Sequence, residues 1–216
     1  LVERWQWIWI WMGNPDDADP ADIPDFAPFG FGVEGWFAET SVLLPVKANF
    51  LLPFENLLDA THVTFLHVGT VDSGDVAAGD FRVEQDGCRI RVTRTIREEL
   101  QSPLTMKTFG FKGSRMNRTI IADAIVPNLS GVRVALSSPE DPEAGTKINQ
   151  LLVGITPETS RTTLEFTAVA QTFPFVNPDR EADVRNLLME DVWAMEEIQA
   201  LFDSLRPDRR VEYSVR

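Results

Sequence analysis

The chain has 216 residues and a formal net charge of −13, with 20 Lys and Arg residues against 33 Asp and Glu residues. So acidic a chain is repelled by phosphate backbones and anionic lipid, and we expect no nucleic acid and no membrane among its partners. Its single cysteine, Cys88, excludes an intrachain disulfide, a cysteine-rich zinc site and a self-contained iron–sulfur cluster. The length suits one large domain, and the composition fits a cytoplasmic protein.

The N-terminal segment is expected to be a strand followed by a linker. Tryptophans at alternate positions over Glu3–Trp11 indicate a strand with one aromatic face. Residues 14–28 are rich in Asp, Pro and Ala, a composition typical of a linker. Because the chain starts inside a strand and without Met, we expect residues 1–28 to remain from a junction with a missing N-terminal domain, and residues 29–216 to form the functional domain.

Most of the chain between residues 30 and 172 predicts short strands. Asp86-Gly87 and Thr156-Pro157-Glu158-Thr159 are turn sequences, and such short links favour antiparallel pairing. A helical pattern from Phe54 to Phe65 interrupts the series, and Gly69 is expected to end it. The expected strands are Gly30–Phe37, Thr40–Val46, Phe81–Gln85, Arg89–Ile96, Leu104–Phe111, Arg118–Val126, Val132–Ser137, Lys147–Ile155 and Arg161–Thr172.

One long helix is predicted near the C-terminus, from about Asp179 to Leu205, and the alternation over Arg209–Val215 suggests a final strand. Consecutive antiparallel strands that are covered by one long helix define an α+β domain, not an alternating α/β one.

The two histidines of the chain, His62 and His67, lie in the same short segment. Imidazole is the commonest transition-metal ligand in proteins, so the pair suggests a metal site. A spacing of i,i+5 does not place two side chains on one helix face, however. The pair alone therefore leaves surface decoration as an equal alternative.

Asp191 falls inside the apolar stripe of the C-terminal helix when the helix is projected at 100° per residue. A buried carboxylate is costly unless it is paired or binds a metal. With His62 and His67 it would complete a 2-His-1-carboxylate facial triad, which is typical of non-haem Fe(II) oxygenases, although zinc accepts the same ligands. An ion pair with a buried arginine is the structural alternative. The stripe consists of Val184, Leu188, Met195, Ile198, Phe202 and Leu205.

Two polar residues precede His62 at helical intervals. The carboxylate of Asp59 is expected to accept the proton on the second nitrogen of a ligand imidazole, which would fix its tautomer. Asn56, one turn earlier, could supply an amide beside the site or a further weak ligand. Exposed positions on the helix are the alternatives for both.

The motif Asn56-x2-Asp59-x2-His62-x4-His67, followed by a helix with Glu190-Asp191, resembles the catalytic domain of Rieske non-haem iron oxygenases. It is most similar to the branch of vanillate and dicamba O-demethylase oxygenases. The segment Trp9-Ile10-Trp11-Met12-Gly13-Asn14-Pro15 and the turn Thr156-Pro157-Glu158-Thr159 match that branch as well.

The resemblance implies a START-like helix-grip fold, in which the C-terminal helix grips the antiparallel sheet. It implies a mononuclear Fe(II) held by His62, His67 and Asp191, with Asp59 linking this iron to the Rieske cluster of a neighbouring subunit in a homotrimer. The implied reaction is activation of O2 with electrons from NAD(P)H, delivered by a separate reductase or ferredoxin, for O-demethylation or hydroxylation of an aromatic compound.

One departure from that family is large. One cysteine and two histidines cannot supply the ligands of a [2Fe–2S] Rieske cluster. Either an upstream domain that holds the cluster is missing or the chain has lost its electron source, and we expect the former. The fragment should then bind iron but fail to turn over on reductant.

The substrate pocket is expected to be apolar, with Phe109 and Val153 in its lining and Arg133 or Gln150 as an anchor for a carboxylate or phenol. Two other functions compete with the oxygenase hypothesis. One is a helix-grip module that binds a small molecule without redox chemistry. The other is zinc-dependent hydrolysis, which would leave zinc in the isolated protein.

Overall fold

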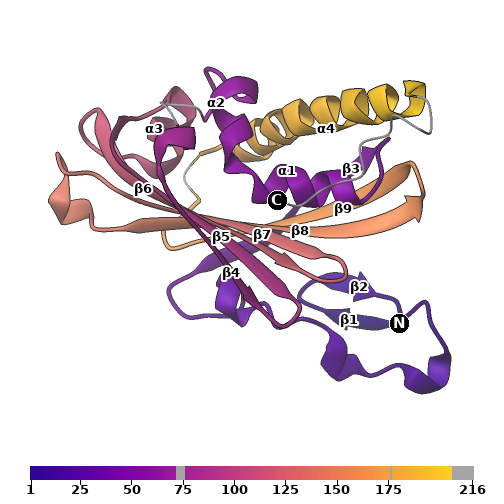
Figure 1. Ribbon diagram of the computed structural model, residues 1–216. Coiled ribbons are helices and arrows are strands. Elements are labelled where there is room, and N and C mark those ends of the chain that lie inside the picture. The colour runs from indigo at the N-terminus through magenta and orange to yellow at the C-terminus, as the bar shows by residue number, and fades with distance from the viewer. Residues whose placement is uncertain (72–75, 176, 206–216) are drawn as a thin grey trace.

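The computed structural model describes residues 1–71, 76–175 and 177–205. Over these residues the fold is built on a seven-stranded antiparallel sheet in the order β3-β9-β8-β7-β6-β5-β4. Figure 1 shows this sheet as a middle layer, with the helices on one face and the N-terminal segment on the other. The strands are β3 (Phe37–Val46), β4 (Asp80–Asp86), β5 (Arg89–Leu100), β6 (Arg115–Ile125), β7 (Leu129–Ser137), β8 (Lys147–Thr159) and β9 (Thr162–Gln171). The strand expected over 209–215 lies outside the described residues.

The helix layer covers the sheet with the long helix α4. Leu44 and Val46 of β3 pack against Leu188, Val192 and Met195 of α4, and all five are buried. The sequence therefore predicted the α+β class and the gripping helix correctly. The helices are α1 (Leu51–Leu58), α2 (Val63–Leu66), α3 (Pro103–Phe109) and α4 (Arg180–Ser204).

The central part of α4 makes the closest contact with the sheet. Its fully buried residues all lie between Leu188 and Met195, and Ile198 is 41% exposed although it belongs to the predicted stripe. An α-helix of 25 residues is about 37 Å long, so the ends of α4 extend beyond the part that it buries. No helix within the described ranges has both the length and the apolar composition needed to span a membrane.

The N-terminal strand predicted over Glu3–Trp11 is instead a hairpin of β1 (Val2–Arg4) and β2 (Trp7–Trp9). Trp5 and Gln6 form the turn with φ values of 60° and 64°, a conformation for which Gly and Asn are the usual residues. Packing overrides this preference, because the Trp5 indole stacks on Phe26 and its Nε1–H donates to the carbonyl of Pro24.

The strand predicted over Gly30–Phe37 is wrong except for its last residue, because β3 begins at Phe37 and runs on through Val46. A 3-10 turn over Ala27–Phe29 ends at Gly30, which has a φ of 95°. A side chain at Gly30 would place its Cβ 2.2 Å from the ring of Trp36, so close packing requires a glycine there.

The strand predicted over Leu104–Phe111 is also wrong, because this segment forms the helix α3. Ser102 caps the helix by accepting a hydrogen bond from the N–H of Thr105, and Pro103 occupies the first helical position. Gly110 ends it with a φ of 61°. These are ordinary signals for the start and end of a helix. The prediction of a strand instead followed the alternation of apolar residues in the segment.

Candidate metal centre and pocket

The histidine segment is not the continuous helix that its pattern predicted. After α1 the chain breaks at Asp59, which takes φ −97° and ψ 87°, and continues as a 3-10 turn into the short helix α2. The Asp59 carboxylate caps this turn by accepting the N–H and the hydroxyl of Thr61. His62 directly precedes α2 and His67 directly follows it, so the two histidines flank this short helix. The two imidazole centroids lie 5.2 Å apart.

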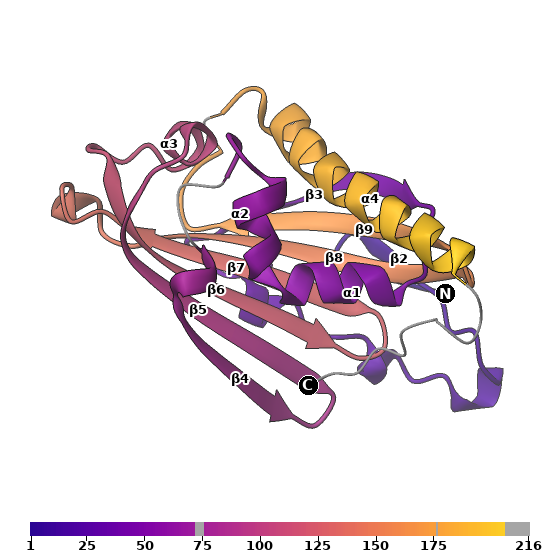
Figure 2. The ribbon, with the colours of Figure 1, turned by 45° about the horizontal axis from the view of Figure 1, so that its top comes forward.

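The fold brings His62, His67 and Asp191 together, with one ligand atom of each within 4.8 Å of the others. Oδ1 of Asp191 lies 3.4 Å from Nε2 of His62 and 3.1 Å from Nε2 of His67. Ligand atoms about 2.1 Å from one ion are about 3.0 Å apart at right angles and about 3.4 Å apart at the tetrahedral angle. The spacing therefore fits a divalent transition metal. Figure 2 shows α2, which the two histidines flank, and α4, which carries Asp191, together on one face of the sheet.

Both imidazoles have an acceptor at Nδ1. Nδ1 of His62 contacts the backbone carbonyl of Asp59, and Nδ1 of His67 lies 2.6 Å from Oε2 of Glu190. These acceptors favour a proton on each Nδ1 and leave each Nε2 lone pair directed at the common point. Burial by itself would lower the pKa of His67, but the hydrogen bonds and charges of Asp191 and Glu190 raise it above its usual value.

Glu190 is a site residue to which the sequence analysis assigned no role of its own. Its carboxylate faces His67, and the hydroxyl of Thr70 lies 3.2 Å from the same Oε2 atom. Its position next to Asp191 in the sequence could have indicated this contact, because Glu190 lies at Nδ1 of His67 and Asp191 lies at Nε2 of the same ring.

Asn56 donates from Nδ2 to Oδ1 of Asp191 at 3.0 Å, so its amide lies beside the cluster. Asp191 is 7% exposed, and within the described residues its carboxylate contacts Asn56 and the two imidazoles and no buried arginine. The contact expected for the Asp59 carboxylate is different. That carboxylate binds Thr61, and the backbone carbonyl of Asp59 faces the imidazole instead.

A second carboxyl group lies under the same helix layer. Glu165 of β9 is 4% exposed. Burial raises its pKa to about 8, and the negative charge of Asp191 adds to this effect. Glu165 therefore keeps its proton at neutral pH.

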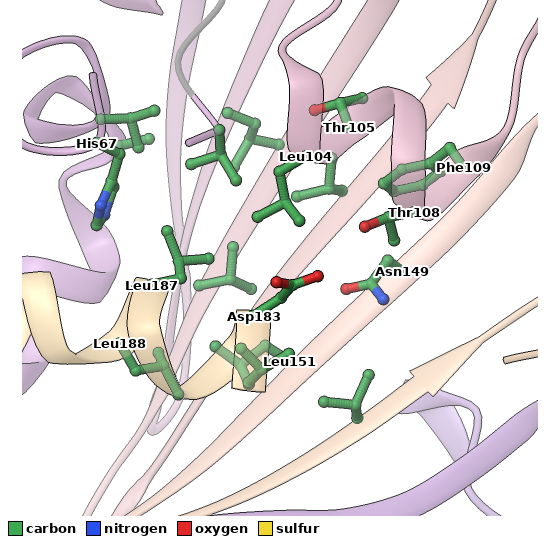
Figure 3. Close-up of a pocket in the computed structure, with 18 of the residues that line it drawn as sticks. His67, Leu104, Thr105, Thr108, Phe109, Asn149, Leu151, Asp183, Leu187 and Leu188 are labelled. Carbon is green, nitrogen blue, oxygen red and sulfur yellow. The ribbon is translucent and has the colours of Figure 1, made fainter. Parts of the chain in front are cut away.

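A pocket of about 230 Å³ opens from the cluster and runs between the sheet and the helices. In Figure 3, His67 lies on one side of this pocket, and Thr108, Phe109 and Asn149 lie on the other. Most of the wall is apolar, as the sequence predicted. The lining includes Leu57, Val63, Ile120, Val132, Leu151 and Leu187.

Of the four expected substrate residues, Phe109 lines the pocket. Val132 and Val134 of β7 also line it, so Arg133 between them faces the opposite side of the sheet. There Arg133 donates from Nε to Oε1 of Gln150, its partner on β8, at 3.0 Å. Val153 is fully buried and lies outside the described lining. Arg133, Gln150 and Val153 therefore lie outside the lining of this pocket.

A sheet gripped by a long helix, with two imidazoles and a carboxylate converging at an apolar pocket, defines a helix-grip domain with a candidate mononuclear metal centre. The model of the family described as vanillate O-demethylase oxygenase C-terminal domain matches residues 46–216. The chain belongs to this family, and the resemblance drawn from its motif is confirmed. A comparison with curated proteins found no match.

Solved structures agree with this assignment at the level of the fold. Dicamba monooxygenase bound to 3,6-dichlorosalicylic acid is 22% identical, with a TM-score of 0.82 over 95% of this chain and 63% of that chain. Dicamba monooxygenase with non-heme iron and dicamba gives 22% identity and a TM-score of 0.71, over 95% and 61%. The NdmA QL mutant of Pseudomonas putida CBB5 with theobromine gives 15% and 0.56, over 90% and 48%. The chain thus spans less than two thirds of the length of these proteins.

Proposed function

We propose that this chain is the catalytic domain of a terminal oxygenase that acts on an aromatic compound by O-demethylation or hydroxylation. In this proposal His62, His67 and Asp191 hold mononuclear Fe(II) on one face and leave the opposite face open to O2 and substrate. The observation that carries the proposal is the convergence of these three side chains at one end of an apolar pocket. Bound Fe(II) would activate O2 there with electrons that come from outside the domain.

The surrounding residues have positioning roles in this proposal. Glu190 and the carbonyl of Asp59 hold the protons on the two Nδ1 atoms, so that both Nε2 atoms stay available. Asn56 orients the Asp191 carboxylate through its amide. The apolar wall excludes water from the reacting end and holds an aromatic ring by burial of its faces.

Electrons would arrive through Asp59, which is exposed on the surface three residues before His62. We assign their source to a [2Fe–2S] Rieske cluster outside this sequence, because one exposed cysteine and two histidines at the metal centre leave no ligand set for it. A neighbouring subunit of a cytoplasmic homotrimer would present that cluster, and a separate reductase or ferredoxin would reduce it. Residues 1–28 would then belong to the junction with the Rieske domain and residues 29–216 to the catalytic domain.

Metal binding tests the proposal without turnover. The purified chain is reconstituted with Fe(II) under anaerobic conditions, and nitric oxide is added to form the EPR-active nitrosyl adduct. We expect one iron per chain in the wild type and in Glu197→Ala, which removes an exposed carboxylate of the same helix. His62→Ala and Asp191→Ala should lose both the iron and the EPR signal.

Unchanged stoichiometric iron binding in the His62 and Asp191 variants would reject the assignment of these ligands. Zinc instead of iron in the protein as isolated would favour a hydrolase. A chain that binds aromatic ligands but no metal would favour a helix-grip binding module without redox chemistry.

A further inference from the structure

The strand β4 forms one edge of the sheet, and neither of its faces is covered. All of its residues, Asp80–Asp86, are exposed, and within the described ranges β5 is the only strand that pairs with it. Two of them are large and apolar, Phe81 at 59% exposed and Val83 at 54%. Figure 2 shows β4 as the outermost strand beside β5. An exposed edge with apolar side chains is a template for pairing with a further strand.

The turn after β4 determines which of its backbone groups face outward. Two residues join β4 to β5, and Asp86 lies opposite Arg89 next to this loop. In a hairpin with a two-residue loop, the residues next to the loop exchange both backbone hydrogen bonds, and bonded pairs recur at every second position. Asp86 and every second residue before it therefore bond to β5. The groups that point away from the sheet are the N–H and C=O of Phe81, Val83 and Gln85.

The sequence of β4 is complementary to itself when two copies run antiparallel. If Val83 lies opposite Val83 of a second copy, the whole strand is paired, and the outward groups form about six hydrogen bonds. The same register places Arg82 of each copy opposite Glu84 of the other. These side chains are 73% and 47% exposed, and Nη2 of Arg82 lies 2.8 Å from Oε1 of Glu84 in the single chain. Charged side chains commonly keep edge strands apart, but here opposite charges would meet.

We propose that β4 binds a second copy of this chain by antiparallel edge pairing, which joins the two sheets across a two-fold axis. Such a contact uses the same patch on both chains and closes on itself. One short strand buries less than the roughly 1,200 Å² of a stable interface, so the dimer is weak and depends on concentration. Asp80 lies opposite Asp86 at each end of this register, and their repulsion weakens the contact further. The two-fold contact goes beyond the proposed function and does not require bound metal.

Sedimentation equilibrium of the chain measures the dissociation constant of the dimer. Val83→Pro removes the outward N–H at the centre of the contact but takes no hydrogen bond from β5, and an edge strand tolerates proline at such a position. We expect the dissociation constant to rise about tenfold or more. Val83→Thr keeps both the N–H and a β-branched side chain, and its dissociation constant should stay within about threefold of the wild type.

Charge reversal gives a test that a general loss of fold cannot imitate. Arg82→Glu leaves two acidic side chains in the contact, and Glu84→Arg leaves two basic ones. Each variant alone brings like charges together, so each should dimerise about tenfold more weakly than the wild type. In an equimolar mixture every acidic side chain meets a basic one. A mixed dimer should then form with an affinity close to that of the wild type.

A wild-type chain that stays monomeric at concentrations on the order of 1 mM would overturn the proposal. So would a dimer that survives Val83→Pro, or a mixture of the two charge variants that associates no better than either one. Hydrogen exchange identifies a different occupant of the edge. The amides of Phe81, Val83 and Gln85 should become protected only as the dimer forms, whereas protection in the monomer would assign the edge to another segment of the same chain and reject the dimer.

Discussion

Replacement of Glu165 by Gln should abolish a large part of the pH dependence of stability. The Glu165 carboxyl group is buried on β9, and its pKa is raised by burial, and further by Asp191, from 4.5 to about 8. Between these two values the folded state holds a proton that the unfolded chain has released. The free energy of unfolding must therefore fall as pH rises through this interval, and it levels off above about pH 8.

The size of the effect follows from the two pKa values. A difference of about 3.5 pH units at about 1.36 kcal/mol per unit corresponds to a loss of about 5 kcal/mol between pH 4.5 and pH 8. Glu165→Gln keeps the shape and a neutral side chain but cannot ionise. Wild type and variant should have similar stability at pH 5, whereas at pH 8.5 the variant should be more stable by roughly 3 to 5 kcal/mol.

Urea unfolding of the metal-free protein at intervals from pH 5 to pH 8.5 measures this difference, because a bound metal would offset the charge of Asp191. Glu197→Gln, at an exposed position of α4, reports the general effect of removing one carboxylate. A difference between wild type and Glu165→Gln that stays constant across this range would refute the assignment of a protonated Glu165.

Two further predictions concern the metal centre and the opposite face of the sheet. Glu190→Ala removes the acceptor at Nδ1 of His67, and we expect metal affinity to fall roughly 10- to 100-fold in a competition titration with a chelator; unchanged affinity would contradict its positioning role. Asp123 is 4% exposed, and burial by itself would raise its pKa. Hydrogen bonds from Arg89 and Arg91 outweigh burial and hold the pKa of Asp123 below its usual value. Its contribution to stability should be present at neutral pH and lost as pH falls below about 4, opposite in sign to Glu165. Asp123→Ala should cost about 3 to 5 kcal/mol in urea unfolding at pH 7, and a loss below 1 kcal/mol would contradict the pairing.

Local patterns in the sequence were sufficient for the architecture. The apolar period of α4 and the alternation of β5 to β9 follow from burial of one face, which each element must satisfy wherever it packs. The same period marked Asp191 as a carboxylate on a buried face, and the structure finds it 7% exposed. The residue types and their spacing also carried the family resemblance.

Other features depend on contacts between distant segments, and these the sequence did not determine. The break at Asp59 separates α1 from the segment that carries His62 and His67, and it is held by a cap that competes with continuation of the helix. Trp5 and Gln6 turn in a left-handed conformation because the aromatic packing of Trp5 outweighs local preference.

The identity of the charged residues that line the pocket also depends on the tertiary structure. Arg133 or Gln150 was the expected anchor, but the pleat of the sheet turns both away from the pocket, and on the opposite face they bind each other. Arg180, at the start of α4, lines the pocket and pairs with Glu39 of the edge strand β3. Periodicity reports which face of an element is buried, whereas the neighbour that covers that face is decided when the elements pack. The sequence therefore determined the fold class and the candidate metal residues, and the tertiary structure decided what surrounds them.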